Sequence, residues 1–459
     1  MVFVDATSND LWTMNADGSN AALFLKHPDD KRYFFPIWFR GGNRIAYVSS
    51  LITAAGAQLT VESRDRKGGD PVVLLDDPRA VDLSLQNGRL LYSVREPSPN
   101  EYDSNLWELR YDEETGKPTS RPRRLTDWTG FFFVNPQLTA DGNRFFFLNG
   151  RSQSDIYVGE LTSGGSEMRT PQRLTLNERV DWPGGWSADS KTIYLYSDRN
   201  GNFDIYRQNL DSRNAEPIAA GTEEKWAPQP TPDGKWILYM QWPKVTGGAK
   251  PSAGKLMRIP ASGGPAEAVM DIKGHGGLFA GDDPTNTVSG FPSFRCPPRT
   301  SAACVLAEKG ENETVFTAFD PVQGRKAVVA KVAGDPSYAS WDLSPDGANI
   351  AITIFSYKAS DMEIVPVNGG AVKKMNAMPW TELSAVAWSA DGKSLFLGSY
   401  SSRGTAIVRM PLVGGPKLLF KQPSWDIFTL VPSPDGRYLA FGPTVGTANA
   451  WTIPNFPRK

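Results

Sequence analysis

Apolar residues recur along the chain in short runs, and a polar turn separates the two runs of each pair. The clearest copies are "LTADGNRFFFL" from Leu138, "WSADSKTIYLYS" from Trp186, "PTPDGKWILYM" from Pro230, "LSPDGANIAITI" from Leu343, "VAWSADGKSLFLGS" from Val386 and "PSPDGRYLAFG" from Pro432. The run after the turn is apolar at consecutive positions, so both faces of that strand must be covered. The pattern therefore predicts β-hairpins that belong to small sheets stacked face to face.

The turn of this phrase has a fixed chemistry and a fixed spacing. Ser/Thr-x-Asp-Gly supplies a carboxylate that accepts hydrogen bonds from backbone N–H groups, and then a glycine that tolerates positive φ. The turn aspartates are Asp141, Asp189, Asp233, Asp346, Asp391 and Asp435, and the steps within each half of this series are 44 to 48 residues. We interpret them as hairpin formers of a repeat architecture.

Each repeat continues with a less uniform third strand, a Gly-rich turn such as Gly369-Gly370, and a short fourth strand. Four strands per period of this length form one blade of a β-propeller, so the predicted fold class is all-β. Weaker copies begin at Ile37, Leu83 and Phe291. With them the inner strand pair occurs nine times, whereas the outer strand occurs ten times.

This unequal strand count leaves the number of rings open. The alternatives are one ring of nine or ten blades, two smaller rings in tandem, or a chain that lacks an upstream part. We favour a single large ring of eight to ten blades, because no Pro/Ser/Gly-rich linker interrupts the period. The predicted blades of this single domain, 1–459, are 1–30 (partial), 31–78, 79–126, 127–175, 176–222, 223–272, 273–335, 336–383, 384–430 and 431–459 (partial).

The repeat resembles that of a known family. Trp186 to Tyr196, followed by "SDRNGNFDIY" from Ser197, is similar to the repeats of TolB-like (WD40-like) propellers. The irregular Cys-containing blade and the end of the chain resemble the C-terminal propellers of bacterial winged-helix or Ser/Thr-kinase sensor proteins. The resemblance implies an extracytoplasmic module that docks or senses a protein. The chain departs from TolB because it lacks TolB's smaller N-terminal α/β domain.

Charge and hydropathy remove other function classes. The 49 basic and 50 acidic residues give a net charge of −1, which provides no field for nucleic acid, so no nucleic-acid partner is expected. No apolar run approaches the roughly 20 residues that span a bilayer, so membrane insertion is not expected. No export signal is visible at the N-terminus, so either the protein stays inside the cell or the native chain is longer and is exported to the periplasm or the extracellular space, as we expect.

Familiar catalytic constellations are not visible in the sequence. The two histidines, His27 and His275, lie far apart, and metal-dependent propeller enzymes need several imidazoles. No G-x-S-x-G motif occurs, so a hydrolase nucleophile is not indicated. Asp198 and Asp204 either help to bind Ca²⁺ or, as we favour, hydrogen-bond a loop. We therefore expect a monomeric protein that is not an enzyme and has no metal or cofactor.

Four Trp-containing segments are the candidate binding site. They stand just before or at the start of inner strands, where a propeller chain approaches its central channel, and aromatic residues with a polar edge anchor protein or sugar ligands. The alternative is that each Trp wedges neighbouring sheets apart. The candidate ligand-binding residues are Asp181, Trp182, Lys225, Trp226, Trp341, Asp342, Trp425 and Asp426.

The two cysteines and the partner complete the predictions. Cys296 and Cys304 either form a disulfide across a hairpin, which implies an oxidising compartment, or are two buried thiols. The leading function is a protein- or peptide-binding module of a bacterial system. The alternative is a carbohydrate-binding or carbohydrate-active propeller that uses channel carboxylates and tryptophans.

Overall fold

The computed structural model shows a protein built almost entirely of β-strands, which confirms the all-β fold class. It describes residues 1–459 except 6–7, 29–30, 54–55, 98–102, 178, 244–252, 274–292, 299–302, 312, 334–338, 355–360, 401–403, 423–425, 455 and 457–459. The helical element among the described residues is a 3₁₀ turn, Ser163–Gly165. None of the described helical structure is long and apolar enough to cross a membrane.

The chain divides into two compact units. Unit 1 contains Met1–Arg151 and Thr447–Lys459, and unit 2 contains Ser152–Lys244 and Pro251–Gly446. The two crossing points fall within strands β13 (Phe145–Ser154) and β38 (Tyr438–Ile453). Unit 2 is therefore an insertion into the chain of unit 1.

The described strands of unit 2 form six antiparallel sheets, here called blades I to VI. Blade I contains β37 (Asp426–Pro432), β38, β14 (Tyr157–Thr162), β15 (Glu167–Met168) and β16 (Gln172–Arg173). Blade II contains β17 (Asp181–Trp186), β18 (Thr192–Ser197), β19 (Asp204–Asn209) and β20 (Glu216–Ala219), and blade III contains β21 (Glu224–Pro230), β22 (Trp236–Trp242), β23 (Ala253–Pro260) and β24 (Glu267–Lys273). Blade IV contains β25 (Ser293–Arg295), β26 (Cys304–Lys309), β27 (Glu313–Asp320) and β28 (Gly324–Ala333), and blade V contains β29 (Ala339–Leu343), β30 (Asn349–Ile354), β31 (Asp361–Pro366) and β32 (Lys373–Asn376). Blade VI contains β33 (Leu383–Trp388), β34 (Ser394–Ser399), β35 (Thr405–Pro411) and β36 (Lys417–Gln422).

Six buried apolar clusters join these blades in a closed cycle. Each cluster takes side chains from two consecutive blades, in the order I–II, II–III, III–IV, IV–V, V–VI and VI–I. The last of them packs Ala387 and Phe396 of blade VI against Ile427 and Phe441 of blade I. Unit 2 is therefore a closed six-bladed β-propeller.

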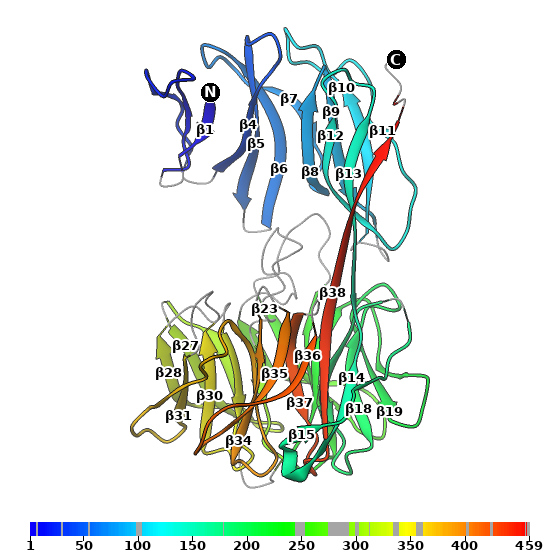
Figure 1. The fold of residues 1–459 in the computed structure, drawn as a ribbon, viewed down its shortest axis with the longest axis vertical. Coiled ribbons are helices and arrows are strands. Elements are labelled where there is room, and N and C mark those ends of the chain that lie inside the picture. Colours follow the sequence, from blue (N-terminus) through cyan, green and yellow to red (C-terminus); the bar gives the residue numbers. More distant parts are fainter. Residues whose placement is uncertain are drawn as a thin grey trace. The chain divides into compact units, whose positions relative to one another are not determined.

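Blade I closes the ring with strands from both ends of unit 2. Its inner strands, β37 and β38, come from the end of the unit, and its outer strands come from the start. β38 pairs with β14 over Tyr438 to Phe441, so segments 278 to 284 residues apart lie side by side (Figure 1). This pairing is the mutual completion of one blade by two distant segments that is expected of a propeller.

The turn aspartates form the hairpins that the sequence predicts. In each of the six turns the Ser or Thr hydroxyl donates to the Asp carboxylate, at 2.5 to 2.6 Å. The same oxygen accepts the backbone N–H two residues further on. The following glycine has positive φ, for example 69° at Gly234, and Ser190 takes the same conformation where glycine is absent. The hairpins are thus fixed by contacts within a few residues.

The described strands of unit 1 form a row of four sheets, here called sheets A to D. Sheet A contains β1 (Val2–Val4), β2 (Leu11–Thr13) and β3 (Ala22–Leu25), and sheet B contains β4 (Lys31–Trp38), β5 (Arg44–Thr53), β6 (Gly56–Asp65) and β7 (Val72–Asp76). Sheet C contains β8 (Ala80–Gln86), β9 (Arg89–Arg95), β10 (Ser104–Arg110) and β11 (Arg123–Arg124), and sheet D contains β12 (Phe132–Leu138), β13 and the last part of β38. Buried clusters join A to B, B to C and C to D.

The predicted blade bounds and the observed sheets differ mainly at two places. Most of β37 falls within the predicted blade 384–430, although it pairs with β38 in blade I. The predicted blade 127–175 is divided, because β38 lies between β13 and β14 and its two halves belong to different units. A single ring of eight to ten blades therefore differs from the structure, in which the closed ring has six.

A candidate binding cavity at the centre of the ring

Unit 2 encloses a cavity of about 340 Å³ that is lined by the inner strands of all six blades. This volume is at the lower end of the range found for small-molecule and cofactor sites. Side chains from the Asp-Gly turns, such as Pro345, Ala390 and Pro434, line one end of it. The cavity therefore lies in the central channel of the ring.

Tryptophans form much of the wall. Trp182, Trp226 and Trp341, all predicted site residues, line the cavity together with Trp186 and Trp388. Each of the five is between 3% and 6% exposed and belongs to a cluster between two blades. The tryptophans therefore serve first as wedges between sheets, as the structural alternative predicts, and they present only a small part of their surface to the cavity.

One ion pair supplies the charge at the cavity. Among the described residues that line it, Arg295 and Asp342 are the charged ones, with Nε of the arginine 3.3 Å from Oδ1 of the aspartate. Burial raises the pKa of Asp342, and Arg295 opposes this shift. The guanidinium also lies over the Trp341 ring, 5.4 Å from its centroid. The ion pair is thus held in a largely apolar wall.

Strand β29 connects three blades through consecutive side chains. The Trp341 indole donates to Ser293 Oγ of blade IV at 2.7 Å. Ser340 Oγ and Asp342 Oδ2 accept backbone N–H groups of blade VI, from Val386 at 3.0 Å and from Trp388 at 2.8 Å. Because these bonds join inner strands, they fix the width of the channel on this side.

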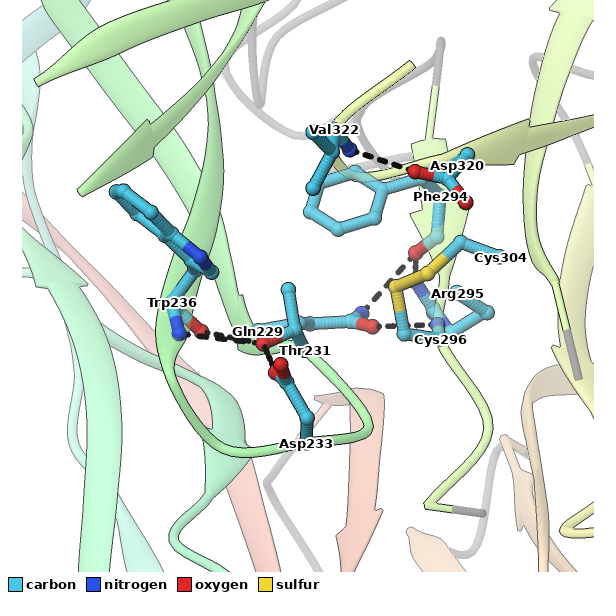
Figure 2. The surroundings of a disulfide bond; sticks show 10 residues. All are labelled: Gln229, Thr231, Asp233, Trp236, Phe294, Arg295, Cys296, Cys304, Asp320 and Val322. Carbon is cyan, nitrogen blue, oxygen red and sulfur yellow. Dashed lines mark hydrogen bonds between the residues drawn. A yellow bond between two sulfur atoms is a disulfide. The ribbon is translucent and has the colours of Figure 1, made fainter. Parts of the chain in front are cut away.

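Blade IV is held by a disulfide and by a glutamine from blade III. The structure pairs Cys296 with Cys304, so the disulfide alternative of the sequence is the one observed. Figure 2 shows the Gln229 side chain beside it, donating to Phe294 O at 3.0 Å and accepting the Cys296 N–H at 3.2 Å. β25 is only three residues long, so these links position Arg295 at its end.

The interface between blades II and III depends on close backbone approach. A Cβ atom added at Gly184 would lie 2.3 Å from the Pro228 carbonyl oxygen, which no side chain permits. Pro230 lies similarly close to Gly185. The two glycines that follow Trp-Pro in β17 therefore allow the prolines of β21 to pack directly against the β17 backbone.

Two predicted site residues are buried within the blades and are not among those that line the cavity. Asp181 is fully buried and accepts hydrogen bonds from Arg199 at 2.7 Å and from Asn177 at 2.5 Å. Lys225 is buried and donates to Asp204 Oδ1 at 2.9 Å. Adjacent residues of a strand point to opposite faces, so each charged residue turns away from its Trp neighbour.

Two further predicted residues are placed less fully. Trp425 lies outside the described residues. Asp426 is the first residue of β37. Cavity residues that the sequence did not indicate include Arg295, Gln229 and Phe428. For Arg295 the available signal was its place next to Cys296 in the one irregular blade.

Buried aspartates lie near the start of blade II. Desolvation raises the pKa of Asp198 to about 6, although its Oδ1 accepts the Val180 N–H at 2.8 Å. Burial likewise raises the pKa of Asp155 to about 6, against the opposing charge of Arg173. Asp204 accepts the Gly221 N–H at 3.2 Å and a bond from Lys225 at 2.9 Å. The described residues contain no group of three His, Cys, Asp or Glu that could hold a metal ion.

Comparison with known proteins finds distant similarities. The chain matches no protein-family model. It is 29% identical to an uncharacterised protein of Agrobacterium fabrum over 276 residues, which cover 59% of this chain and 79% of that protein. It is also similar to solved structures of a protein assigned as TolB from Agrobacterium tumefaciens (17% identity, TM-score 0.44, 64% of this chain and 98% of that one) and of TolB from Acinetobacter baumannii (17%, 0.28, 64% and 65%). The closed ring of six four- and five-stranded sheets makes unit 2 a six-bladed β-propeller, and its repeat phrase resembles that of TolB-like propellers.

Proposed function

We propose that the TolB-like propeller of unit 2 docks a peptide segment of a protein partner in its central cavity. It would act without catalysis, as the docking or sensing module of a bacterial system. The observation that carries the proposal is the central cavity to which all six blades contribute, with tryptophan and proline in its walls. Apolar, aromatic walls with a few fixed polar groups are typical of sites that bind side chains of a partner.

The disulfide supports a native location outside the cytoplasm. Disulfides persist in oxidising compartments such as the bacterial periplasm and are rare in reducing ones. Cys296, which forms the disulfide with Cys304, lines the cavity, and the Gln229 side chain bonds the backbone of Phe294 and of Cys296. We therefore propose that the protein binds its partner in the periplasm.

Selection from a phage-displayed peptide library tests the docking function. The protein should enrich a peptide set, and Phe428→Ala, which removes apolar wall from the cavity, should weaken binding at least tenfold. Val322→Ala is the matched control, because Val322 is 65% exposed and is not among the residues lining the cavity. Failure to enrich any peptide, or equal loss in both variants, would contradict the proposal.

A carbohydrate ligand is the second candidate, and the tryptophans beside the Asp342 carboxylate favour it. Glycosidases commonly work with two carboxylates, whereas Asp342 is the carboxylate among the described lining residues, so binding is the form of this candidate that fits. A glycan array probed with the same proteins separates the two. Glycan binding that Phe428→Ala removes, without peptide enrichment, would favour carbohydrate.

A further inference from the structure

We propose that Arg295 captures the C-terminal carboxylate of the docked peptide, so that the cavity of unit 2 recognises a free chain end. This inference rests on the peptide-docking function proposed above. It adds the chemical group that the cavity selects and the residue that selects it. Arginine is suited to this role, because its planar guanidinium offers several donors to one carboxylate.

The guanidinium of Arg295 is fixed on three sides. Its Nη1 donates to Phe294 O at 2.8 Å, its Nε faces Asp342, and its plane lies over Trp341. Nη2 has no partner among the described residues, and the side chain is 31% exposed. One edge of a positioned cation is therefore left for a ligand at the cavity.

The enclosure of the cavity favours a chain end over an internal segment. Inner strands of all six blades surround it, so a peptide enters along the axis of the ring. An internal segment would have to enter and turn back within about 340 Å³. A terminus enters once, and its carboxylate is the group that complements the one cation among the described lining residues. Capture of chain termini by fixed donors is a known mode of peptide recognition.

Asp342 competes with the ligand for Arg295. The groups that face it are Arg295 from β25, the Trp388 N–H from β33 and, at the same cavity, the buried Tyr196 phenol of β18. Burial raises the pKa of both Tyr196 and Asp342. The phenol therefore stays neutral, and as the pH falls Asp342 gains its proton before the peptide carboxylate does. A protonated Asp342 releases Arg295 to the peptide carboxylate.

The pH dependence follows from this competition. Affinity for a free chain end should rise as the pH falls through the raised pKa of Asp342, because Asp342 becomes neutral while the peptide carboxylate, with an ordinary pKa of about 3.5, stays charged. Below about pH 4 the peptide itself is protonated and affinity should fall. Asp342→Asn should bind the free acid more tightly at pH 7.5 and lose this rise in affinity at lower pH.

The experiment compares pools of N-acetylated tetrapeptides, randomised at every position, on the immobilised protein. One pool has free C-terminal carboxylates, the second has C-terminal amides, and the third has amides with a fixed glutamate at the penultimate position. Bound peptides are quantified by mass spectrometry. We expect at least tenfold greater retention of the free acids than of either amide pool, and loss of this preference in Arg295→Gln.

Arg258→Gln is the matched control. Arg258 lies 4.5 Å over the Trp236 ring and pairs with Glu267, but it is not among the residues lining the cavity. It should leave the preference unchanged. Equal loss in both variants, equal retention of acids and amides, or a preference for the glutamate pool overturns carboxylate capture. Equal retention leaves peptide docking standing, whereas retention of no pool overturns both proposals.

Discussion

The two units are built from the same repeat, yet among the described strands only those of unit 2 close into a ring. In unit 2 six clusters join six blades in a cycle, whereas in unit 1 three clusters join sheets A to D in a row. The hairpin turns are alike, since Asp141 of sheet D makes the same contacts as Asp189 of blade II. The repeat phrase thus specifies a single sheet. Closure of the ring requires contacts between distant segments, such as the packing of blade VI against blade I.

The same bulge in an inner strand has different surroundings in the two units. β4 and β21 both shift register before a proline, with Phe35 at φ 48° and Ala227 at φ 53°. Ala227 lines the central cavity of the ring, whereas Phe35 is 71% exposed. A backbone feature of the repeat therefore becomes part of a site only where other inner strands surround it.

The largest expected effect comes from opening the ring at the interface of blades I and II. Trp186 is buried there, donates to Val431 O at 2.8 Å and stacks on Tyr438. Trp186→Ala leaves a cavity and an unpaired carbonyl, so we expect unit 2 to lose about 3–5 kcal/mol of unfolding free energy. Chemical denaturation, with hydrogen exchange to assign each transition to a unit, measures the loss.

Trp38→Ala is the corresponding change in unit 1. Trp38 ends β4 as Trp186 ends β17, but it is only partly buried against the cluster between sheets A and B. We expect a smaller loss of about 1–2 kcal/mol, confined to unit 1. Equal losses, or a loss of unit 2 protection limited to blades I and II, would show that closure does not make the ring cooperative.

A smaller effect compares two aspartates, one in each unit, whose pKa values are shifted in opposite directions. The pKa of Asp198 in unit 2 is raised to about 6, so the folded state binds its proton more tightly than the unfolded state does. Its contribution to stability is present at about pH 4 and is lost as the pH rises through 6. Asp198→Asn, which keeps an oxygen for the Val180 N–H, should therefore stabilise unit 2 by about 1–3 kcal/mol at pH 7.5.

Asp112 of unit 1 provides the opposite case. Hydrogen bonds from the Thr115 N–H and hydroxyl lower its pKa, so its contribution is present at neutral pH and is lost as the pH falls below 4. Asp112→Asn should lower the stability of unit 1 at pH 7.5. Denaturation at pH 4 and 7.5 tests both variants, and a stabilising Asp112→Asn or a destabilising Asp198→Asn would contradict the assignment of sign.

The sequence predicted what depends on near neighbours and missed what depends on distant ones. The turns at Asp189 and Asp391 and the Cys296–Cys304 pair are set within a few residues, and they are found as predicted or among the stated alternatives. The size of the ring depends on the pairing of β38 with β14, and no pattern within a short stretch of sequence predicts a pairing between segments so far apart. At the candidate site, Trp182, Trp226 and Trp341 line the cavity as predicted positions, but Asp181 accepts a hydrogen bond from Arg199 of its own blade.

The smallest effect tests whether the repeat phrase has the same value in both units. Asp189→Ala and Asp141→Ala each remove a carboxylate that accepts one hydroxyl and one backbone N–H two residues on. Because these contacts are local and exposed, each variant should lose about 0.5–1 kcal/mol, in its own unit only. Denaturation resolved by unit measures both losses. If Asp141→Ala cost more than twice as much as Asp189→Ala, the turn would carry more of the stability of the open row than of the ring, and the two units would differ already at the level of the hairpin.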